Sequence, residues 1–288
     1  MLNSLGIDVI ILDHHEAGPL GRPDAAAVVN AKIEENSPYT YLCSAGVVFK
    51  LAHALLKERK LKTFDLKLYL DLVAVATVAD IVPLVAENRI LVRHGLGRLA
   101  HSRHTGLKTL TEIAGIRPSD SVNHAGFLNA AHVGFRIGPR INASGRIQNG
   151  KEAVDLLTEK DFSIALEKAN QINQYNETRK DLDKTMTEEA NQIVADLEGL
   201  AERRSIVLYN EDWHKGVIGI VASRLTEIYY RPAVVLTRTD DMATGSARSV
   251  SGFDVYKAIE YCRDLLENFG GHTYAACLLY TSPSPRDA

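Results

Sequence analysis

Cysteine is scarce in this sequence, and its pattern excludes two kinds of site. The chain contains three cysteines, Cys43, Cys262 and Cys277, with no Cys-x-x-Cys spacing. Such usage is typical of a reducing compartment and argues against both a disulfide framework and a metal site built from thiolates. We therefore expect a cytoplasmic protein.

Long hydrophobic runs and a strong net charge are also missing. No apolar run approaches the roughly 20 residues that a membrane-spanning helix requires, and the start of the chain has no signal-peptide pattern. The formal net charge is -3, so positive charge for nucleic acid would have to be concentrated in a local cleft. We expect neither secretion nor a membrane partner.

The remaining composition is that of a globular α/β protein. The 288 residues are 45% hydrophobic and 24% charged, which leaves room for about two domains. Residues 7–12 predict a strand buried on both faces, in a parallel sheet, and residues 40–57 and 65–79 have helical spacing of apolar positions. We expect the first domain to cover residues 1–157.

A long connecting helix is expected over residues 158–200. The segment has no proline and no glycine before Gly199, and it opens with a capping-box-like Thr158-Glu-Lys-Asp161. If continuous, its roughly 40 residues would span about 60 Å. The middle, residues 173–183, is polar, as in a helix that bridges two domains.

A second, smaller α/β domain is expected over residues 201–277. Its predicted elements are strands at 205–209, 232–237 and near 243–249, a helix from about Val217, and a helix over 254–268.

Both ends of the chain look unusual. A buried strand at residue 7 would have few partners for parallel pairing, so we expect sequence to be missing upstream. Residues 278–288 (LLYTSPSPRDA) have no periodicity and are interpreted as a tail foreign to the fold.

Asp13, His14 and His15 form the first candidate site. They directly follow the strand run VIIL, and ligands in open α/β sheets bind beyond the carboxyl ends of strands. Imidazole and carboxylate together suit Mn²⁺ or Mg²⁺. From the tripeptide alone, a surface turn that happens to carry two histidines is as good an interpretation as a metal site.

Asp80 is the second candidate. It ends an almost uncharged apolar run in TVADIVPL, and Pro83 stops the helix soon after. Capping or a buried hydrogen bond would satisfy this carboxylate. Metal ligation becomes the better interpretation only if Asp80 meets His14.

Basic and glycine-rich segments supply further candidates. Residues 134–147 place Arg136, Arg140 and Arg146 among glycines and a proline, which suits a phosphate-binding loop but equally a solvated one. Residues 213–225 predict a helix start whose free amides could hold an anion. GSARS at 245–249 and GGH at 270–272 are weak signals alone.

Taken in order, DHH, ADIVPL, GPRINASGR, WHKGVIGIVASRL, GSARS and GGHTYAA resemble the DHH phosphoesterase superfamily. Within it the chain is most similar to the RecJ single-strand-specific exonucleases, from about residue 6 to 276. The ADIVPL and PRINASGR forms and the long helix indicate RecJ in particular.

The resemblance implies a catalytic DHH domain joined by a long helix to a DHHA1 domain, with two divalent metals, Mn²⁺ or Mg²⁺. It also implies a monomer that degrades single-stranded DNA from the 5′ end in repair and recombination. His14 and Asp80 would be metal ligands, His15 would contact metal or phosphate, and Asp13 would orient His14. The implied substrate contacts are Arg140, Asn142 and Arg146 near the metals, and Ser246, Arg248, Gly271 and His272 in the second domain.

The sequence also departs from the family pattern. An Asp-rich DxDG motif before the DHH strand, a further aspartate, the glycine after GGHxxAA and an oligonucleotide-binding domain are all missing. We therefore expect a RecJ portion truncated at both ends and inactive by itself. The alternatives are a DHH enzyme for short oligonucleotides or cyclic dinucleotides, and a catalytically dead nucleic-acid-binding module.

Overall fold

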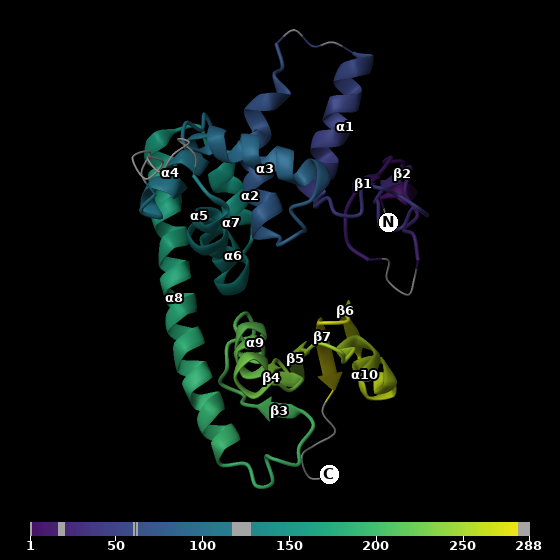
Figure 1. The fold of residues 1–288 in the computed structure, drawn as a ribbon, viewed down its shortest axis with the longest axis vertical. Helices are drawn as coiled ribbons and strands as arrows, with labels where there is room; N and C mark the ends of the chain where they lie inside the picture. The colour runs from purple at the N-terminus through teal and green to yellow at the C-terminus, as the bar shows by residue number, and fades with distance from the viewer. Residues whose placement is uncertain (1, 17–20, 60, 62, 117–127, 282–288) are drawn as a thin grey trace. The chain divides into compact units, whose positions relative to one another are not determined.

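The computed structural model describes residues 2–16, 21–59, 61, 63–116 and 128–281 (Figure 1). The chain divides into two compact units. Unit 1 comprises the residues up to Ser144 together with Asn149–Gln174, and unit 2 comprises Gly145–Gln148 and the residues from Tyr175 onward. The chain therefore crosses between the units within two of its helices.

Unit 1 begins with a two-stranded parallel sheet. β1 (Ile10–Leu12) pairs with β2 (Ala27–Val29) in the register Ile10 to Ala27. The strand expected here is present, but it is not buried on both faces, because Ile10 is 63% exposed. A single pairing strand covers little of the surface that a central strand would hide.

The rest of unit 1 is helical. The expected helices at 40–57 and 65–79 correspond to α1 and to η2 followed by α2. In the described part of the chain no helix is long and apolar enough to cross a membrane. The elements are η1 (Asn3–Leu5), α1 (Ser44–Glu58), η2 (Leu66–Tyr69), α2 (Leu70–Ala79), α3 (Ala86–Leu99), α4 (Thr105–Ile113), α5 (Ala130–His132), η4 (Val133–Ile137), α6 (Gly138–Ile147) and α7 (Lys151–Leu157).

The arginine-bearing segment at 134–147 is helical, which corrects the expected loop. A π-helical turn, η4, runs directly into α6, and the Gly138 N–H donates to the Val133 carbonyl. Proline has no N–H to donate to the preceding turn. Pro139 is tolerated here because it directly follows a π-helical turn, where the hydrogen-bond pattern of the helix is already shifted. The Gly-Pro pair therefore marks a change of helix type and not a break.

The long helix α8 (Phe162–Ala195) has 34 residues, so it spans about 51 Å. Its cap differs from the expected one. The Asp161 carboxylate accepts from the Ile164 N–H at 3.0 Å, whereas Thr158 ends α7 and donates to the Val154 carbonyl. Asp161 is thus the N-cap, and the helix is shorter at both ends than expected.

One stripe of α8 explains its polar middle. Ile172, Asn176, Arg179, Asp183 and Met186 follow a spacing of four and three residues, which places them on one helix face. Asn176 is 1% exposed and Asp183 is 7% exposed. The polar middle is therefore partly buried, with Arg179 donating to Asn176 at 2.7 Å.

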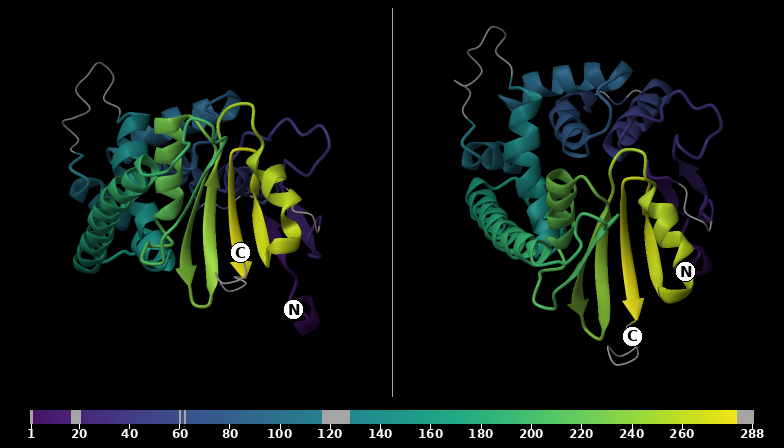
Figure 2. Two further views of the ribbon diagram at one scale, coloured as in Figure 1. Left: turned by 90° about the horizontal axis from the view of Figure 1, so that it is seen from below. Right: turned by 60° about the horizontal axis from the view of Figure 1, so that its bottom comes forward.

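Unit 2 contains a five-stranded mixed sheet in the order β3-β4-β5-β7-β6 (Figure 2). β3 and β4 are parallel and are linked through α9, and the other pairs are antiparallel. The core beside α9 contains Val235, and the opposite core beside α10 contains Ala247. The elements are β3 (Ile206–Tyr209), α9 (Ile218–Tyr229), β4 (Ala233–Thr239), β5 (Met242–Arg248), α10 (Val255–Tyr261), η5 (Arg263–Leu265), β6 (Asn268–His272) and β7 (Ala275–Thr281).

Two expectations for unit 2 need correction. The helix expected over 254–268 ends at Tyr261, and β6 already begins at Asn268. Residues 278–281 of the expected foreign tail belong to β7 and pair with β5, and Leu278 is 8% exposed. Its apolar side chain adds to the core beside α10. Residues 282–288 of that tail lie outside the described residues.

Candidate functional site

Asp13, His14 and His15 leave the sheet at the carboxyl end of β1. The Asp13 N–H still donates to the Val29 carbonyl at 3.1 Å, so the backbone extends the β1–β2 pairing. The Asn30 side-chain amide then donates to the His15 carbonyl at 2.8 Å, and Asn30 is 5% exposed. A buried amide therefore fixes the turn that carries the tripeptide.

His14 and Asp80 meet in the structure. His14 Nε2 lies 2.7 Å from Asp80 Oδ2, although the two residues belong to different motifs. Asp80 is the C-cap residue of α2, so the carboxylate extends from a packed helix end. The His14 side chain is 14% exposed and that of Asp80 is 41% exposed. This is the contact on which the metal-ligand interpretation of Asp80 depends.

The tripeptide also forms a cluster by itself. One ligand atom from each of Asp13, His14 and His15 can be chosen so that all lie within 4.8 Å of one another. Burial is the largest influence on the Asp13 carboxyl and raises its pKa, but hydrogen bonds from His15 and from backbone N–H groups outweigh it and leave the pKa below its usual value. The Asp13 carboxylate is therefore ionised at neutral pH and adds negative charge beside the two imidazoles.

These groups fit a divalent cation. The imidazoles of His14 and His15 and the carboxylates of Asp13 and Asp80 lie together, and Mn²⁺ binds both types of group. The His15 side chain is 75% exposed and faces solvent, whereas His14 is held between other groups. The cluster therefore has a fixed inner side and an open outer side.

The partner that holds His14 differs from the expected one. His14 Nδ1 lies 2.9 Å from Ser44 Oγ and 3.9 Å from Asp13 Oδ1. Asp13 makes its short contact with His15 Nδ1, at 2.7 Å. Sequence reasoning missed Ser44, because a serine at a helix start carries no signal for a contact 30 residues away.

In unit 1, Arg140 is half-buried and already engaged. Its Nε donates to Asn173 Oδ1 at 2.9 Å and its Nη1 to the Arg136 carbonyl at 2.7 Å. A Cβ on Gly138 would lie 3.2 Å from the Ala79 Cβ, so the start of α6 packs against the last residue of α2. Arg140 is thus placed beside the helix that carries Asp80.

Asn142 lies one half-turn further along α6 and is exposed. Its amide is therefore accessible to a ligand from solvent.

Arg146 belongs to unit 2 and lies among other cations. Its Nη1 donates to the Gly216 carbonyl at 3.1 Å. Burial lowers the pKa of the Arg146 guanidinium, and the positive charges of Arg179 and Arg248 lower it further, while the Asp183 carboxylate raises it and offsets part of this repulsion. Like charges in close proximity destabilise each other, so an anion at this cluster would relieve the repulsion. The sequence did not indicate Arg179 as a member.

Arg248 and Ser246 meet the first turn of α9. Arg248 Nη1 donates to Ser246 Oγ at 2.9 Å and to the Ala247 carbonyl at 2.7 Å. A Cβ on Gly219 would lie 2.9 Å from both Ser246 Oγ and Arg248 Nη2. Glycine therefore lets the helix start approach the guanidinium, and burial lowers the Arg248 pKa.

Gly271 and His272 lie on the edge strand β6. Gly271 has φ 154°, and a Cβ there would collide with the Ala275 carbonyl and with Ala276, so this glycine has a packing role. His272 is exposed and pairs with Ala275, which in turn pairs with Arg248. His272 and Arg248 therefore share one row and one face of the sheet, roughly 10 Å apart.

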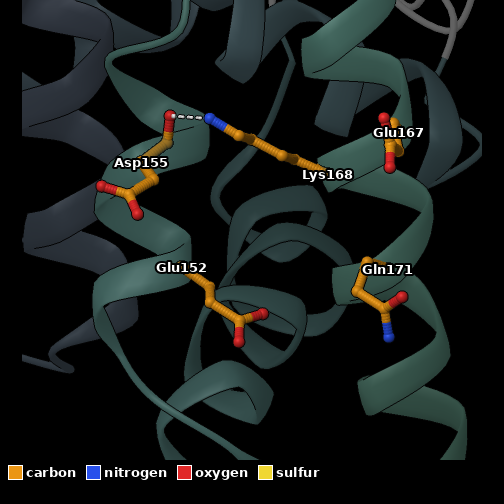
Figure 3. Close-up of a pocket in the computed structure, with 5 residues that line it drawn as sticks. All are labelled: Glu152, Asp155, Glu167, Lys168 and Gln171. Carbon is orange, nitrogen blue, oxygen red and sulfur yellow. Dashed lines mark hydrogen bonds between the residues drawn. The ribbon is translucent and has the colours of Figure 1, made fainter.

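Unit 1 contains a cavity of about 220 Å³ between α7 and α8 (Figure 3). It is lined by Glu152, Asp155, Glu167, Lys168 and Gln171. The Lys168 ammonium reaches the Asp155 carbonyl at 3.4 Å and the Glu159 carboxylate at 2.9 Å. An acidic lining repels phosphate, so this cavity does not suit a nucleic-acid backbone.

Arg248 also borders a shallow hollow of about 350 Å³ in unit 2, together with Tyr230 and Ser249. Arg248, a member of the arginine cluster, is therefore reachable from solvent.

Comparison with known proteins covers both units. The family model described as "DHH family, N-terminal domain" matches residues 1–77, and the DHHA1 domain matches residues 202–283. The single-stranded-DNA-specific exonuclease RecJ of Bacillus subtilis is 43% identical over 94% of this chain and 33% of its own length. The Escherichia coli RecJ is 36% identical over 96% of this chain and 49% of its own length. The chain thus spans about a third to a half of these curated relatives.

Solved structures give the same result. The structure of Thermus thermophilus RecJ in complex with Mn²⁺ matches with a TM-score of 0.82 and 33% identity, over 97% of this chain and 40% of that one. The Mg²⁺ complex of the same protein matches with a TM-score of 0.79 and 32% identity, over 96% and 39%. Sequence and structure thus agree over nearly the whole chain: it carries matches to the DHH and DHHA1 domains and is similar to a portion of the RecJ exonucleases.

Proposed function

We propose that this chain forms the nuclease part of a single-stranded-DNA-specific 5′-to-3′ exonuclease that acts in DNA repair and recombination. The observation that carries the proposal is the 2.7 Å contact between His14 Nε2 and Asp80 Oδ2. The contact joins the tripeptide to the distant segment that carries Asp80, and a simple surface turn would not predict such a contact. The names of the relatives, which are RecJ exonucleases, support the substrate class.

His14, His15 and Asp80 would hold Mn²⁺ or Mg²⁺, and the relatives with those ions in their structures support this. A bound divalent cation supplies Lewis-acid polarisation of a phosphodiester and lowers the pKa of water. The protein keeps His14 between Ser44 and Asp80, and it leaves the exposed His15 to contact the scissile phosphate. A complete site would hold two cations. Among the described residues a single three-group cluster lies within ligand distance, so a second cation would need further carboxylates.

The arginines would hold the strand. Arg140 and Asn142 would contact the backbone in unit 1, and Arg146 would do so in unit 2. The crowded guanidiniums of Arg146 and Arg248 support a phosphate in this position, because it would neutralise them through paired hydrogen bonds. Ser246, Gly271 and His272 would complete the substrate face of the sheet.

The test is DNA cleavage by Bacillus subtilis RecJ in which this chain replaces the corresponding segment. With Mn²⁺, we expect nucleotides to be released from the 5′ end of a single strand, while a blunt duplex and a cyclic dinucleotide stay intact. His15→Ala in the same protein should abolish release without lowering its melting temperature. Preferred hydrolysis of the cyclic dinucleotide, or release that survives His15→Ala, would contradict the proposal.

A further inference from the structure

We propose that Ser44 is a positioning residue of the candidate metal centre: its hydroxyl holds His14 by Nδ1, so that Nε2 faces Asp80 and an incoming cation. The inference rests on the metal site proposed above. It names a residue outside all the motifs that indicated that site.

The hydrogen-bond directions follow from a single hydroxyl proton. Ser44 Oγ lies 3.4 Å from Asp13 Oδ1, to which it donates, and 2.9 Å from His14 Nδ1. An ionised carboxylate can only accept, so the Ser44 proton lies toward Asp13, and the hydroxyl oxygen accepts the Nδ1–H of His14. With Nδ1 protonated, Nε2 is the ring atom that would bind a cation. In the metal-free chain Nε2 lies 2.7 Å from the Asp80 carboxylate, which can only accept, so Nε2 carries a proton that a cation would replace.

Asp13 is poorly placed to do the same. It is 3.9 Å from His14 Nδ1, and the same Oδ1 already accepts from His15 Nδ1 at 2.7 Å. Ser44 bridges the gap between the carboxylate and His14. One hydroxyl thereby couples all three members of the tripeptide.

The backbone around Ser44 makes its position rigid. Ser44 is the first residue of α1, and the preceding Cys43 is 2% exposed. Cys43 Sγ lies 3.5 Å from Thr77 Oγ1, and the Thr77 hydroxyl donates to the Val73 carbonyl at 2.7 Å. Thr77 and Val73 belong to α2, the helix that Asp80 ends. The groups on the two sides of the His14 ring are therefore fixed to the same packed pair of helices.

The first test observes His14 without any metal. We would label histidine with ¹⁵N, assign the His14 signals with a His14→Asn variant, and compare the unsubstituted chain with Ser44→Ala, Ser44→Thr and Ser163→Ala. Ser163 is an exposed serine near the start of α8 and serves as the matched control. We expect a protonated Nδ1 in the unsubstituted chain, its loss or mixing in Ser44→Ala, and retention in the other two.

The second test measures Mn²⁺. Loss of a group that orients a ligand typically lowers metal affinity roughly 10- to 100-fold, and we expect this range for Ser44→Ala. We expect Ser44→Thr and Ser163→Ala to bind as the unsubstituted chain does. Thermal melting separates a positioning effect from unfolding, and Ser44→Cys offers a second variant of similar size with a weaker hydrogen bond.

The outcomes distinguish the two proposals. Unchanged His14 nitrogen signals and unchanged Mn²⁺ affinity in a folded Ser44→Ala chain would overturn the role of Ser44. Failure of Mn²⁺ to broaden the His14 signals of the unsubstituted chain would instead contradict the metal site itself.

Discussion

The metal cluster of unit 1 and the arginine cluster of unit 2 are built in different ways. Asp13, His14 and His15 are consecutive, and they need one distant contact, to Asp80, to form a recognisable site. The arginine cluster draws Arg146, Arg179 and Arg248 from α6, α8 and β5, three separate elements.

The two clusters also differ in what holds them. The tripeptide is fixed by side-chain hydrogen bonds around a small sheet. Arg146 and Arg248 are also held by hydrogen bonds, but they additionally need glycines at 216 and 219, where a Cβ would collide with the Arg146 carbonyl or crowd the Arg248 guanidinium. A site made of consecutive residues can therefore be recognised as a sequence motif. A cluster of arginines from separate elements can be recognised only in the folded structure.

The largest expected effect concerns turnover. Two-cation hydrolysis requires ions roughly 3.5–4 Å apart with bridging carboxylates. The described residues contain a single cluster of three potential ligands, Asp13, His14 and His15, which suits one cation. We therefore expect the 288-residue chain alone to release no measurable nucleotide from a 5′-phosphorylated single strand with Mn²⁺. Calorimetry should show weaker Mn²⁺ binding than for a full-length RecJ. Release of nucleotide that His15→Ala abolishes would show that these residues already form a complete site.

Asp80→Asn tests whether the metal cluster and the arginine cluster act independently. Removing this carboxylate takes away a direct ligand, so we expect Mn²⁺ affinity to fall by more than the roughly 10- to 100-fold loss typical of an outer partner. Binding of single-stranded DNA in EDTA should not change, because the arginines are untouched. Asp241→Asn, at an exposed residue of unit 2, is the control. Equal Mn²⁺ affinity in Asp80→Asn would mean that Asp80 only caps α2.

Arg146→Ala tests the second cluster. Losing one phosphate contact should weaken single-strand binding for every base composition. It should also make the slope of log affinity against log salt less steep, by about 1. Arg204→Ala, an exposed arginine in the same unit, should leave that slope unchanged. Fluorescence anisotropy at several salt concentrations measures both. A base-dependent loss, or an unaltered slope in a folded variant, would contradict a phosphate contact.

The smallest expected effect is on stability. A Cβ on Gly216 would collide with the Arg146 carbonyl, whereas a Cβ on Gly270 would meet nothing within 4 Å. We expect Gly216→Ala to lower the free energy of unfolding by about 1–3 kcal/mol, and Gly270→Ala to change it by less than about 0.5 kcal/mol. Urea titrations of both variants provide the comparison. Equal unfolding midpoints would show that α9 can shift away from Arg146 at no cost.

Much of the fold was predictable because its signals are local. The β1 strand, the helices α1 and α2, and the strands β3, β4 and β5 lie close to where periodicity predicted them. The segment at 134–147 was misread, since glycine and proline usually mark loops, and a π-helical turn that accommodates them depends on packing against α2. The same applies to residues 278–281, which have no strand pattern but complete the edge of β5.

The sequence by itself determined the chemical groups: two imidazoles and a carboxylate after a strand, a carboxylate at a helix end, and arginines among glycines. Only the tertiary structure decided their partners. It placed Ser44 rather than Asp13 against His14 Nδ1, and it brought Arg179 to the charges of Arg146 and Arg248. The physical reason is that a hydrogen bond is lost when its atoms move apart by about 1 Å, and that the repulsion between charges depends on their separation. Both distances are set by packing between segments far apart in the chain.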